Sequence, residues 1–352
     1  MTALLDILTA RIAATGPISL ADYMSEALLH PEHGYYATRD PLGAAGDFIT
    51  APEISQMFGE LLGLCLAQTW LDQGAPSRFA LVEPGPGRGT LMADILRATR
   101  AVPNFHAAAE VYFLEASPTL RAEQAKRVPD ARWIDRLSDL PDLPVYLVAN
   151  EFLDALPIRQ FVRDGTAWRE RMVGMDQGGL TFGLSAPAPI TALTHRLEDT
   201  QDGDLVETCP ALPAFIGEIG ARIETKGGAA IFIDYGDWRS LGDTLQALRA
   251  HEKTDPLAAP GTADLTAHVD FEAVARAAAP AKFTRLTPQG VFLERLGITE
   301  RAQALATRLG GEALESHIAA HRRLTHPAEM GDLFKVMGLY PSTATPPPGL
   351  QA

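Results

Sequence analysis

The chain has 352 residues, of which 46% are hydrophobic and 21% are charged, a composition typical of globular enzymes and unlike that of disordered or fibrous proteins. The 44 Asp and Glu residues outnumber the 30 Lys and Arg residues, so the formal net charge is −14. This charge disfavours a nucleic-acid partner and leaves room for a basic one, such as an arginine-bearing protein segment. The length indicates one large domain with insertions, or two domains.

The cysteine content and the first residues bear on the cellular compartment. Only Cys65 and Cys209 occur, which fits a reducing compartment and disfavours a thiolate metal cage. Residues 1–20 contain a single basic residue, Arg11, and no cleavage signal. No apolar run reaches the roughly 20 residues that a membrane-spanning helix needs. We therefore expect a cytoplasmic protein with no membrane insertion and no metal site.

The N-terminal region predicts helices. Apolar residues recur at helical spacing in residues 1–28, where Ser19 is placed to cap the second helix, and again in residues 54–70. Residues 30–46 between them are rich in turn formers. We predict that residues 1–58 form an N-terminal helical cap with a lid loop.

Strands and helices alternate in the middle of the chain. Short buried strands are expected at 79–82, 111–114, 131–134, 145–149 and 229–233, with helices at 90–100, 117–126, 212–224 and 271–279. This alternation is typical of an α/β fold with a doubly wound, mostly parallel sheet. Ligands of such sheets bind beyond the carboxyl ends of the strands.

Other segments depart from this alternation. Residues 158–182 alternate in polarity and contain turn glycines, which predicts an antiparallel hairpin inserted at about residues 158–205. Residues 293–325 are expected to be helical and 333–340 to form a last strand. We predict a core at 59–340 that carries these insertions, followed by a flexible, proline-rich tail at 341–352.

A glycine-rich loop follows the first predicted strand. Gly85, Gly87 and Gly89 alternate with other residues just before the helix that begins at Thr90. Without a Cβ, these residues allow a ligand to lie against the backbone, and the start of the helix offers N–H groups to an anion. The loop therefore predicts a ligand site, and a purely structural turn is the alternative.

Glu83, at the end of the first strand, indicates which ligand this is. The glycine spacing differs from the G-x-G-x-x-G of dinucleotide sites. A carboxylate repels a pyrophosphate, whereas it attracts the ammonium group of a methionine moiety. The sequence thus favours S-adenosylmethionine as the cofactor over a nicotinamide dinucleotide.

Two further acidic residues end predicted strands. Glu115 follows the second strand, where a carboxylate can accept hydrogen bonds from both hydroxyls of a ribose; a helix N-cap is the alternative. Asp135 follows the third strand and could accept a hydrogen bond from an adenine amino group, or it could be a solvated turn residue.

The fourth strand runs into Asn150, Glu151 and Asp154, beside the glycine loop in a doubly wound sheet. A guanidinium group is charged and delocalised, so using one of its nitrogens as a nucleophile requires carboxylates that hold it. Glu151 and Asp154 could do so, and the alternative is a helix start with charges facing water.

Two loops supply additional candidates. Asp47, Phe48 and Thr50 lie in a loop that could close over the donor, although Thr50 or Ser55 could merely cap the next helix. His268 and Asp270, which follow Asp264, form a candidate acid/base pair, although their alternation also fits an ordinary strand edge. His30 and His33 lack the spacing of a metal site and indicate a turn.

Five motifs together resemble one family. GDFITAPEISQMFGELLG, VEPGPGRGTL, VANEFLDALP, IFIDYG and DLTAHVDF resemble the MidA-like methyltransferases, which include the mitochondrial arginine methyltransferase that assists assembly of respiratory complex I. The resemblance extends from about residue 16 to residue 340. It implies a seven-stranded methyltransferase core, S-adenosylmethionine as donor, and methylation of an arginine on a complex I subunit.

The resemblance also bears on the site. It makes Gly85, Gly87 and Glu115 donor contacts and places Asn150 and Glu151 at the reaction site. Together, the residues predict donor contacts at Glu83, Gly85, Gly87, Gly89, Glu115, Asp135, Asn150, Asp47, Phe48 and Thr50, and catalytic roles for Glu151, Asp154, His268 and Asp270. Three other functions are left open, namely a nicotinamide-dependent oxidoreductase, an assembly chaperone without chemistry and a small-molecule methyltransferase. A homodimer is left open as well.

Overall fold

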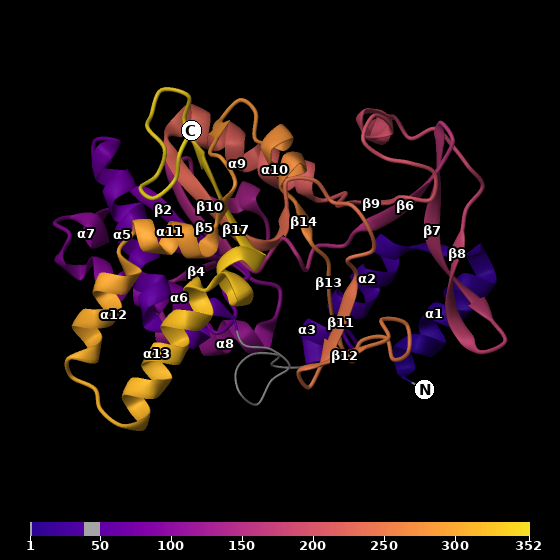
Figure 1. Cartoon of the computed structure of the whole chain (residues 1–352), viewed down its shortest axis with the longest axis horizontal. Coiled ribbons are helices and arrows are strands. Elements are labelled where there is room, and N and C mark those ends of the chain that lie inside the picture. The colour runs from indigo at the N-terminus through magenta and orange to yellow at the C-terminus, as the bar shows by residue number, and fades with distance from the viewer. Residues whose placement is uncertain (1, 39–49) are drawn as a thin grey trace. The chain divides into compact units, whose positions relative to one another are not determined.

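The computed structural model describes residues 2–38 and 50–352, and its contacts divide the chain into two compact units (Figure 1). Unit 1 consists of Met1–Phe48, Asp154–Leu212 and Arg239–Asp270, and unit 2 of Ile49–Leu153, Pro213–Trp238 and Phe271–Ala352. The division expected from the sequence consists of three continuous ranges, 1–58, 59–340 and 341–352, whereas each of these units combines separate segments of the chain. That division stays a prediction.

Unit 2 is built on a largely parallel sheet. Its parallel strands are β2 (Phe79–Pro84), β3 (Ala109–Leu114), β4 (Arg132–Ile134), β5 (Val145–Asn150) and β10 (Gly228–Asp237). They lie in the order β10-β5-β2-β3-β4, and β17 (Phe334–Tyr340) pairs antiparallel with β10. The chain order reverses between β2 and β5, which makes the carboxyl ends of these two strands the place where doubly wound sheets bind ligands.

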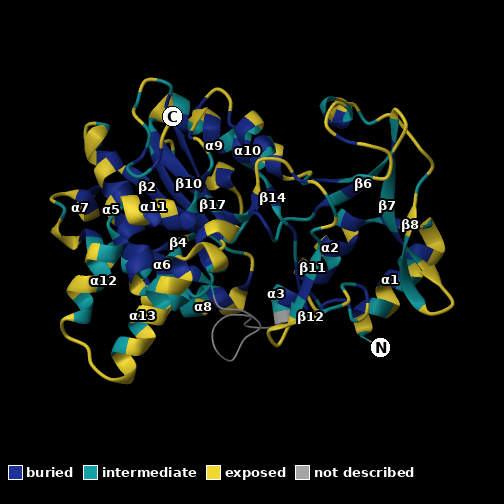
Figure 2. Cartoon of the chain, viewed as in Figure 1, coloured by how far each residue is buried: buried dark blue, intermediate teal, exposed yellow. Residues whose placement is uncertain are grey.

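The predicted fold class is confirmed by this sheet. Every residue of β2 and β5 is buried, as expected of parallel strands covered on both faces. Figure 2 shows buried residues concentrated in β2, β10 and β17 and exposed ones along α12 and α13. The two-residue pieces β15 (Lys282–Phe283) and β16 (Thr287–Pro288) also pair with β17, so the expected number of seven strands stays a prediction.

Helices α5 (Gln56–Asp72) and α6 (Thr90–Ala98) pack unusually closely within unit 2. A Cβ added at Gly59 would lie 2.6 Å from the Cβ of Asp94, and one at Gly63 would lie 2.9 Å from the Cα of Ile95. Only glycine fits at either contact. The two glycines on one face of α5 therefore determine how closely α6, the helix after the glycine loop, approaches it.

The other helices of unit 2 agree broadly with the expected ranges. They are α4 (Ala51–Ile54), α7 (Phe105–Ala108), α8 (Pro118–Arg127), α9 (Leu212–Lys226, whose first residue belongs to unit 1), α10 (Phe271–Ala277), α11 (Gln289–Arg295), α12 (Ile298–Ala306) and α13 (Glu312–Thr325). The region expected to be helical at 293–325 is interrupted because Gly297 and Gly311 adopt positive φ angles of 88° and 56°. Such angles are incompatible with a continuous right-handed helix.

The C-terminal segment, expected to be flexible, contacts the core of unit 2. Leu350 is buried, and the thiol of Cys65 donates a hydrogen bond to the backbone oxygen of Pro348 at 3.3 Å. These contacts hold the end of the chain against α5.

Unit 1 combines the N-terminal helices with the inserted strands. Its elements are α1 (Ala3–Thr15), β1 (Ile18–Ser19), α2 (Leu20–Leu29), α3 (Tyr35–Thr38), β6 (Arg159–Asp164), β7 (Ala167–Asp176), β8 (Gly179–Leu184) and β9 (Leu205–Thr208). The hydroxyl of Ser19 accepts a hydrogen bond from the backbone N–H of Asp22 at 3.0 Å, which confirms the predicted cap of the second helix.

The predicted hairpin belongs to a larger antiparallel sheet. Its strands follow the order β1-β7-β6-β9, and β8 pairs with β7. A second small sheet, with the order β12-β11-β13, is formed by β11 (Gln246–Arg249), β12 (Glu252–Thr254) and β13 (Asp264–Thr266), and β14 (Val269–Asp270) follows. The sequence did not indicate this second sheet because strands of three or four residues are too short for a recognisable alternation.

Candidate functional site

The glycine loop connects β2 to α6 in unit 2. Gly85, Gly87 and Gly89 have φ angles of 60°, 53° and 80°, a conformation that costs other residues free energy because their Cβ clashes with the backbone. The N–H of Gly85 donates a hydrogen bond to the oxygen of Leu114 at 2.9 Å. This bond ties the loop to the end of β3. The three glycines form a turn with positive φ angles, and its role in ligand binding stays a prediction.

Glu83 ends β2 as a buried carboxyl group. Its side chain is only 4% exposed, and its Oε2 atom has no hydrogen-bond partner among the described residues. Burial raises the pKa of Glu83 well above its ordinary value, and the hydrogen bond from the backbone of Met92 offsets this only in part. Ionisation would leave this buried oxygen as an acceptor without a donor, which is costly, and a ligand that carries N–H groups would supply the donor.

Glu115 follows β3 with both of its oxygens engaged. Oε1 accepts a hydrogen bond from the N–H of Ser117 at 2.7 Å, and Oε2 accepts one from Nε2 of Gln124 at 3.1 Å. Burial raises the pKa of Glu115. The N-cap of α8 is Ser117, whose hydroxyl accepts from the N–H of Leu120 at 3.4 Å. Ser117 and not Glu115 therefore caps α8, and Glu115 keeps lone pairs that can accept hydrogen bonds from a ligand.

Asp135 lies beyond β4 with an 81% exposed side chain, 2.5 Å from Nη2 of Arg121. This is the geometry of a solvated turn residue, which was the alternative from sequence. A role in adenine binding stays a prediction.

The last residue of β5 also carries a buried acceptor without a partner. Asn150 is 9% exposed, and its Oδ1 has no hydrogen-bond partner among the described residues. Its Nδ2 donates to Oε1 of Glu151 at 2.9 Å, and the N–H of Ala51 donates to the same oxygen at 3.1 Å. Glu151 has a φ of 51°, a strained conformation for a residue with a side chain, and such strain is concentrated at functional sites.

Asp234, in β10, holds this loop from the neighbouring strand. It is 1% exposed, and its two oxygens accept from the N–H groups of Leu153 and Tyr235, each at 3.0 Å. The N–H of Glu151 also donates to the oxygen of Ile233 at 2.9 Å. The sequence placed Asp234 at the end of a strand and gave it no role. An acidic residue that ends the strand next to Asn150 was the available signal.

Phe152 connects the two loops. A Cβ added at Gly85 would lie 2.8 Å from Cδ2 of Phe152, so the ring occupies the space that the glycine leaves. The same ring lies 5.2 Å from that of Phe215, between centroids. The sequence did not indicate this packing because residues 85 and 152 come together only in the folded chain.

The remaining predicted catalytic residues belong to unit 1, whereas Glu151 belongs to unit 2. Asp154 is buried, and its backbone oxygen accepts from the N–H of Ala267 at 3.0 Å. The N–H of His268 donates to the hydroxyl of Thr244 at 2.8 Å. Within unit 1, the chain therefore brings Asp154 next to the segment that contains His268.

Asp270 makes structural contacts in unit 1. Its carboxylate accepts a hydrogen bond from the N–H of Ser240 at 3.1 Å and lies 3.8 Å from Nη1 of the buried Arg196. These contacts fix the loop that follows residue 238. A shared catalytic role of Asp154, His268 and Asp270 with Glu151 stays a prediction.

The predicted lid loop is described only in part. Asp47 and Phe48 lie outside the described residues. Thr50 is the N-cap residue of α4, without a capping hydrogen bond from its side chain among the described residues, whereas the hydroxyl of Ser55 caps α5 by accepting from Met57 at 3.2 Å. The capping interpretation therefore holds for Ser55, and lid closure stays a prediction.

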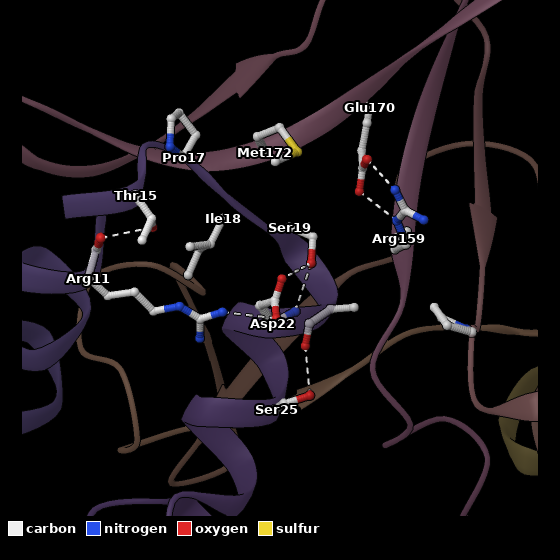
Figure 3. A pocket seen from close by; sticks show the side chains of 12 residues that line it. Arg11, Thr15, Pro17, Ile18, Ser19, Asp22, Ser25, Arg159, Glu170 and Met172 are labelled. Atoms are coloured by element: carbon white, nitrogen blue, oxygen red, sulfur yellow. Dashed lines mark hydrogen bonds and ion pairs between the residues drawn. The ribbon is translucent and has the colours of Figure 1, made fainter. Parts of the chain in front are cut away.

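A groove of about 600 Å³ lies in unit 1 among α1, β1, α2, β6 and β7 (Figure 3). Its charged side chains pair with one another: Arg11 lies 3.1 Å from Asp22, and Arg159 forms a double hydrogen bond with Glu170. The sequence singled out none of these residues, and their mutual pairing leaves no charge that requires a ligand.

Two further findings concern the described residues alone. In residues 2–38 and 50–352, no helix combines the length and the apolar composition needed to cross a membrane. Within the same ranges, no group of three or more His, Cys, Asp or Glu side chains is arranged to hold a metal ion.

Known proteins resemble this chain over most of its length. Residues 61–289 match the model of a family described as "Putative S-adenosyl-L-methionine-dependent methyltransferase". The protein arginine methyltransferase NDUFAF7, mitochondrial, of Mus musculus is 38% identical, covering 97% of this chain and 85% of the relative. The Homo sapiens protein of the same name is 36% identical, covering 97% and 84%.

A solved structure is also similar. A Burkholderia thailandensis protein, crystallised with S-adenosyl-homocysteine bound, is 30% identical and superposes with a TM-score of 0.80, covering 99% of this chain and 93% of that chain. The ligand of that protein is the product of the predicted methyl donor.

The expected cytoplasmic location is wrong by these comparisons, since the mouse and human relatives are named mitochondrial. The expectation rested on the low cysteine content, on the lack of a secretory signal in the first residues and on the lack of a long apolar run. None of these tells one reducing compartment from another.

The family model covers more than half of the chain, and the relatives exceed 30% identity over almost all of it. The parallel sheet, the reversal of its strand order between β2 and β5 and the glycine loop fit this match. The chain therefore belongs to this family of S-adenosyl-L-methionine-dependent methyltransferases and is an enzyme that uses this methyl donor.

Proposed function

We propose that the loops after β2, β3 and β5 of unit 2 bind S-adenosylmethionine and that the enzyme transfers its methyl group to an arginine side chain of a protein. The observation that carries the proposal is the pair of buried, orphaned acceptors, Glu83 Oε2 and Asn150 Oδ1, at the ends of neighbouring strands. A ligand that carries hydrogen-bond donors would satisfy both atoms. The amino group of the methionine moiety is such a donor, and its charge suits a carboxylate.

The residues present fit the rest of this ligand. Gly87 has no Cβ that would keep a ligand from its backbone, whereas Phe152 fills that space at Gly85. The N-terminus of α6 favours the carboxylate of the methionine moiety. Glu115 would accept hydrogen bonds from the ribose hydroxyls. When bound, S-adenosylmethionine supplies an electrophilic methyl group on a sulfonium.

Glu151 would hold the acceptor. Its Oε1 atom is fixed by two hydrogen-bond donors, at 2.9 Å and 3.1 Å, so the carboxylate is oriented before an acceptor arrives. A carboxylate binds a guanidinium through paired hydrogen bonds and limits the rotation of its nitrogens. Holding one nitrogen in line with the methyl group accelerates transfer through orientation.

The proton of the methylated nitrogen must leave after transfer. We assign this step to solvent or to a nearby carboxylate. Asp154 or His268 would assist Glu151 in holding the guanidinium, and Asp270 is a further catalytic candidate. The support is chemical, since these residues are titratable groups within the motifs VANEFLDALP and DLTAHVDF.

The names of the mouse and human relatives support arginine as the acceptor. A complex I subunit is the acceptor that the resemblance of the five motifs implies, and we propose it for this chain. The net charge of −14 suits a basic acceptor segment. A homodimer is compatible with this activity, and sedimentation of the purified enzyme tests it.

Transfer of radiolabelled methyl groups to an extract that lacks the enzyme tests the proposal. Label on a protein band, found as methylarginine after hydrolysis, is expected, and mass analysis of captured partners then identifies the acceptor. Label in the small-molecule fraction would instead establish a metabolite methyltransferase. Donor binding without any transfer would indicate an assembly protein without chemistry. Binding of NAD but not of S-adenosylhomocysteine would overturn the donor site.

A further inference from the structure

Gln124 contacts two of the residues proposed to bind the donor, Gly87 and Glu115. It sits on α8 with none of its surface exposed. A buried amide must satisfy two N–H donors and one oxygen acceptor. The hydrogen-bond partners of Gln124 therefore indicate its role.

All three hydrogen-bonding functions of Gln124 are used. Nε2 donates to the backbone oxygen of Gly87 at 2.7 Å and to Oε2 of Glu115 at 3.1 Å. Oε1 accepts from Nε1 of Trp133 at 2.7 Å. Because an indole N–H can only donate, and a carbonyl and a carboxylate can only accept, these partners fix the orientation of the amide.

These partners belong to three different strand ends. Gly87 is in the loop after β2, Glu115 follows β3, and Trp133 is in β4. The side of α8 that carries Gln124 also supports the glycine loop, since a Cβ at Gly89 would lie 3.5 Å from the Cα of Gln124 and Arg127 donates to the oxygen of Arg88 at 3.2 Å. One side chain thus spans the positions proposed for the methionine moiety and for the ribose.

We infer that Gln124 is a positioning residue that holds the Glu115 carboxylate and the Gly87 backbone at the separation that S-adenosylmethionine requires. This inference rests on the donor site proposed above. Gln124 acts through its partners: with Nε2 on Oε2 and the N–H of Ser117 on Oε1, the carboxylate cannot rotate. Its remaining lone pairs are then aimed in fixed directions at the two ribose hydroxyls.

The test compares two variants and two ligands by calorimetry. Gln124→Met keeps the size of the side chain and removes all three hydrogen bonds, whereas Gln124→Glu keeps the acceptor for Trp133 and removes both donors. The ligands are S-adenosylhomocysteine and its analogue without the 2′- and 3′-hydroxyls. Gln68→Met is the matched control, because Gln68 is an exposed glutamine on α5 that bonds only to Asp72 among the described residues.

We expect Gln124→Met to raise the Kd for S-adenosylhomocysteine by about tenfold or more, the scale of a lost hydrogen bond to a charged group. The Kd for the analogue should rise less, because that ligand makes no use of the oriented carboxylate and loses only the support of the Gly87 backbone. Gln124→Glu should show the same selectivity, and it supplies the measurement if Gln124→Met does not fold. Gln68→Met should match the wild type for both ligands.

An equal rise for both ligands in the Gln124 variants would mean that the residue only supports the fold, and it would overturn the inference. So would an unchanged Kd. A parallel Glu115→Gln variant separates the two proposals. If it loses affinity for S-adenosylhomocysteine while the Gln124 variants do not, the donor site stands and only the inference fails. If Glu115→Gln binds as the wild type does, the donor site itself is misplaced and the inference fails with it.

Discussion

The side-chain amide of Asn150 donates a hydrogen bond to Oε1 of Glu151 at 2.9 Å, so the residue that ends β5 orients the carboxylate that follows it. The backbone N–H of Ala51 donates to the same oxygen. Glu151 is thereby held in a conformation with a φ of 51°, which few residues with a side chain adopt.

Glu151→Gln tests the charge of this residue separately from its shape. A glutamine oxygen can accept both hydrogen bonds, so the loop should keep its conformation. Without the negative charge, the guanidinium is no longer held, and we expect kcat to fall by about 100-fold or more. The Kd of S-adenosylhomocysteine, measured by calorimetry, should stay within about threefold of the wild type. Glu123→Gln on α8 is the control, and an equal loss of donor affinity and turnover would contradict the proposed role.

Gly85→Ala should damage both the fold and the donor site. The new Cβ would lie 2.8 Å from Cδ2 of Phe152, at a φ of 60°. Gly165→Ala is the matched control, because Gly165 has a φ of 62° and no atom within 4 Å of an added Cβ. Thermal or urea unfolding should show a loss of about 1–2 kcal/mol for Gly165→Ala from backbone strain, and a further 1–3 kcal/mol for Gly85→Ala from overpacking.

Only Gly85→Ala should also weaken binding of S-adenosylhomocysteine. Equal destabilisation by the two substitutions would show that Phe152 yields easily and does not connect the two loops.

Donor binding should release a proton from Glu83. Burial raises the pKa of this group in the free protein. The carboxyl group therefore stays protonated at pH values above about 4.3, the ordinary pKa of glutamate. The ammonium group of the donor favours the carboxylate, so affinity should rise with pH across the window between the ordinary and the raised value. Calorimetry in two buffers of different ionisation enthalpy measures the released proton.

The same group has a defined effect on folding. Because the folded state binds the proton more tightly than the unfolded state, the contribution of Glu83 to stability is present below the ordinary value and is lost as pH rises through the raised pKa. Glu83→Gln should abolish both the proton release and this loss of stability. A proton count that is identical in the variant would assign the release to another group.

Asp234→Asn should lower turnover by releasing the loop that carries Glu151. An asparagine can accept from only one of the N–H groups of Leu153 and Tyr235, and its own amide would face the other. We expect faster hydrogen exchange at Leu153 and a kcat that falls about tenfold or more, the scale of one lost charge-assisted hydrogen bond. Asp237→Asn is the control, because Asp237 ends the same strand, is exposed, and accepts from the N–H of Trp238 at 2.7 Å. Equal effects of both variants would remove the special role of Asp234.

Periodicity and motifs predicted the sheet, the glycine loop and the position of Glu151, because each depends on residues that are close in sequence. The strand that ends at Glu83 and the helix that begins at Thr90 were both recognisable from burial pattern and loop chemistry. The resemblance then added the donor and its family, which a glycine loop alone does not specify.

Residues that act across the sheet were not predictable in this way. Asp234 bonds to Leu153, 81 positions earlier in the chain, and Gln124 bonds to Gly87, 37 positions earlier. The local signal for Asp234 is an acidic residue directly after an expected strand, and nothing in the local pattern distinguishes Gln124 from an ordinary helix residue. The small sheet of β11, β12 and β13 was missed for a different reason, since its strands are too short to show an alternation.

The two glycines of α5 have a consequence for ligand binding. Gly59 and Gly63 leave no space between α5 and α6, so the helix that begins at the donor loop has little freedom to shift along its axis. A binding site that already has its ligand-bound conformation loses little conformational entropy when the ligand binds. We expect complexes with the donor and with its product to show nearly the same backbone at residues 85–95, and any rearrangement during turnover to be confined to other parts of the enzyme.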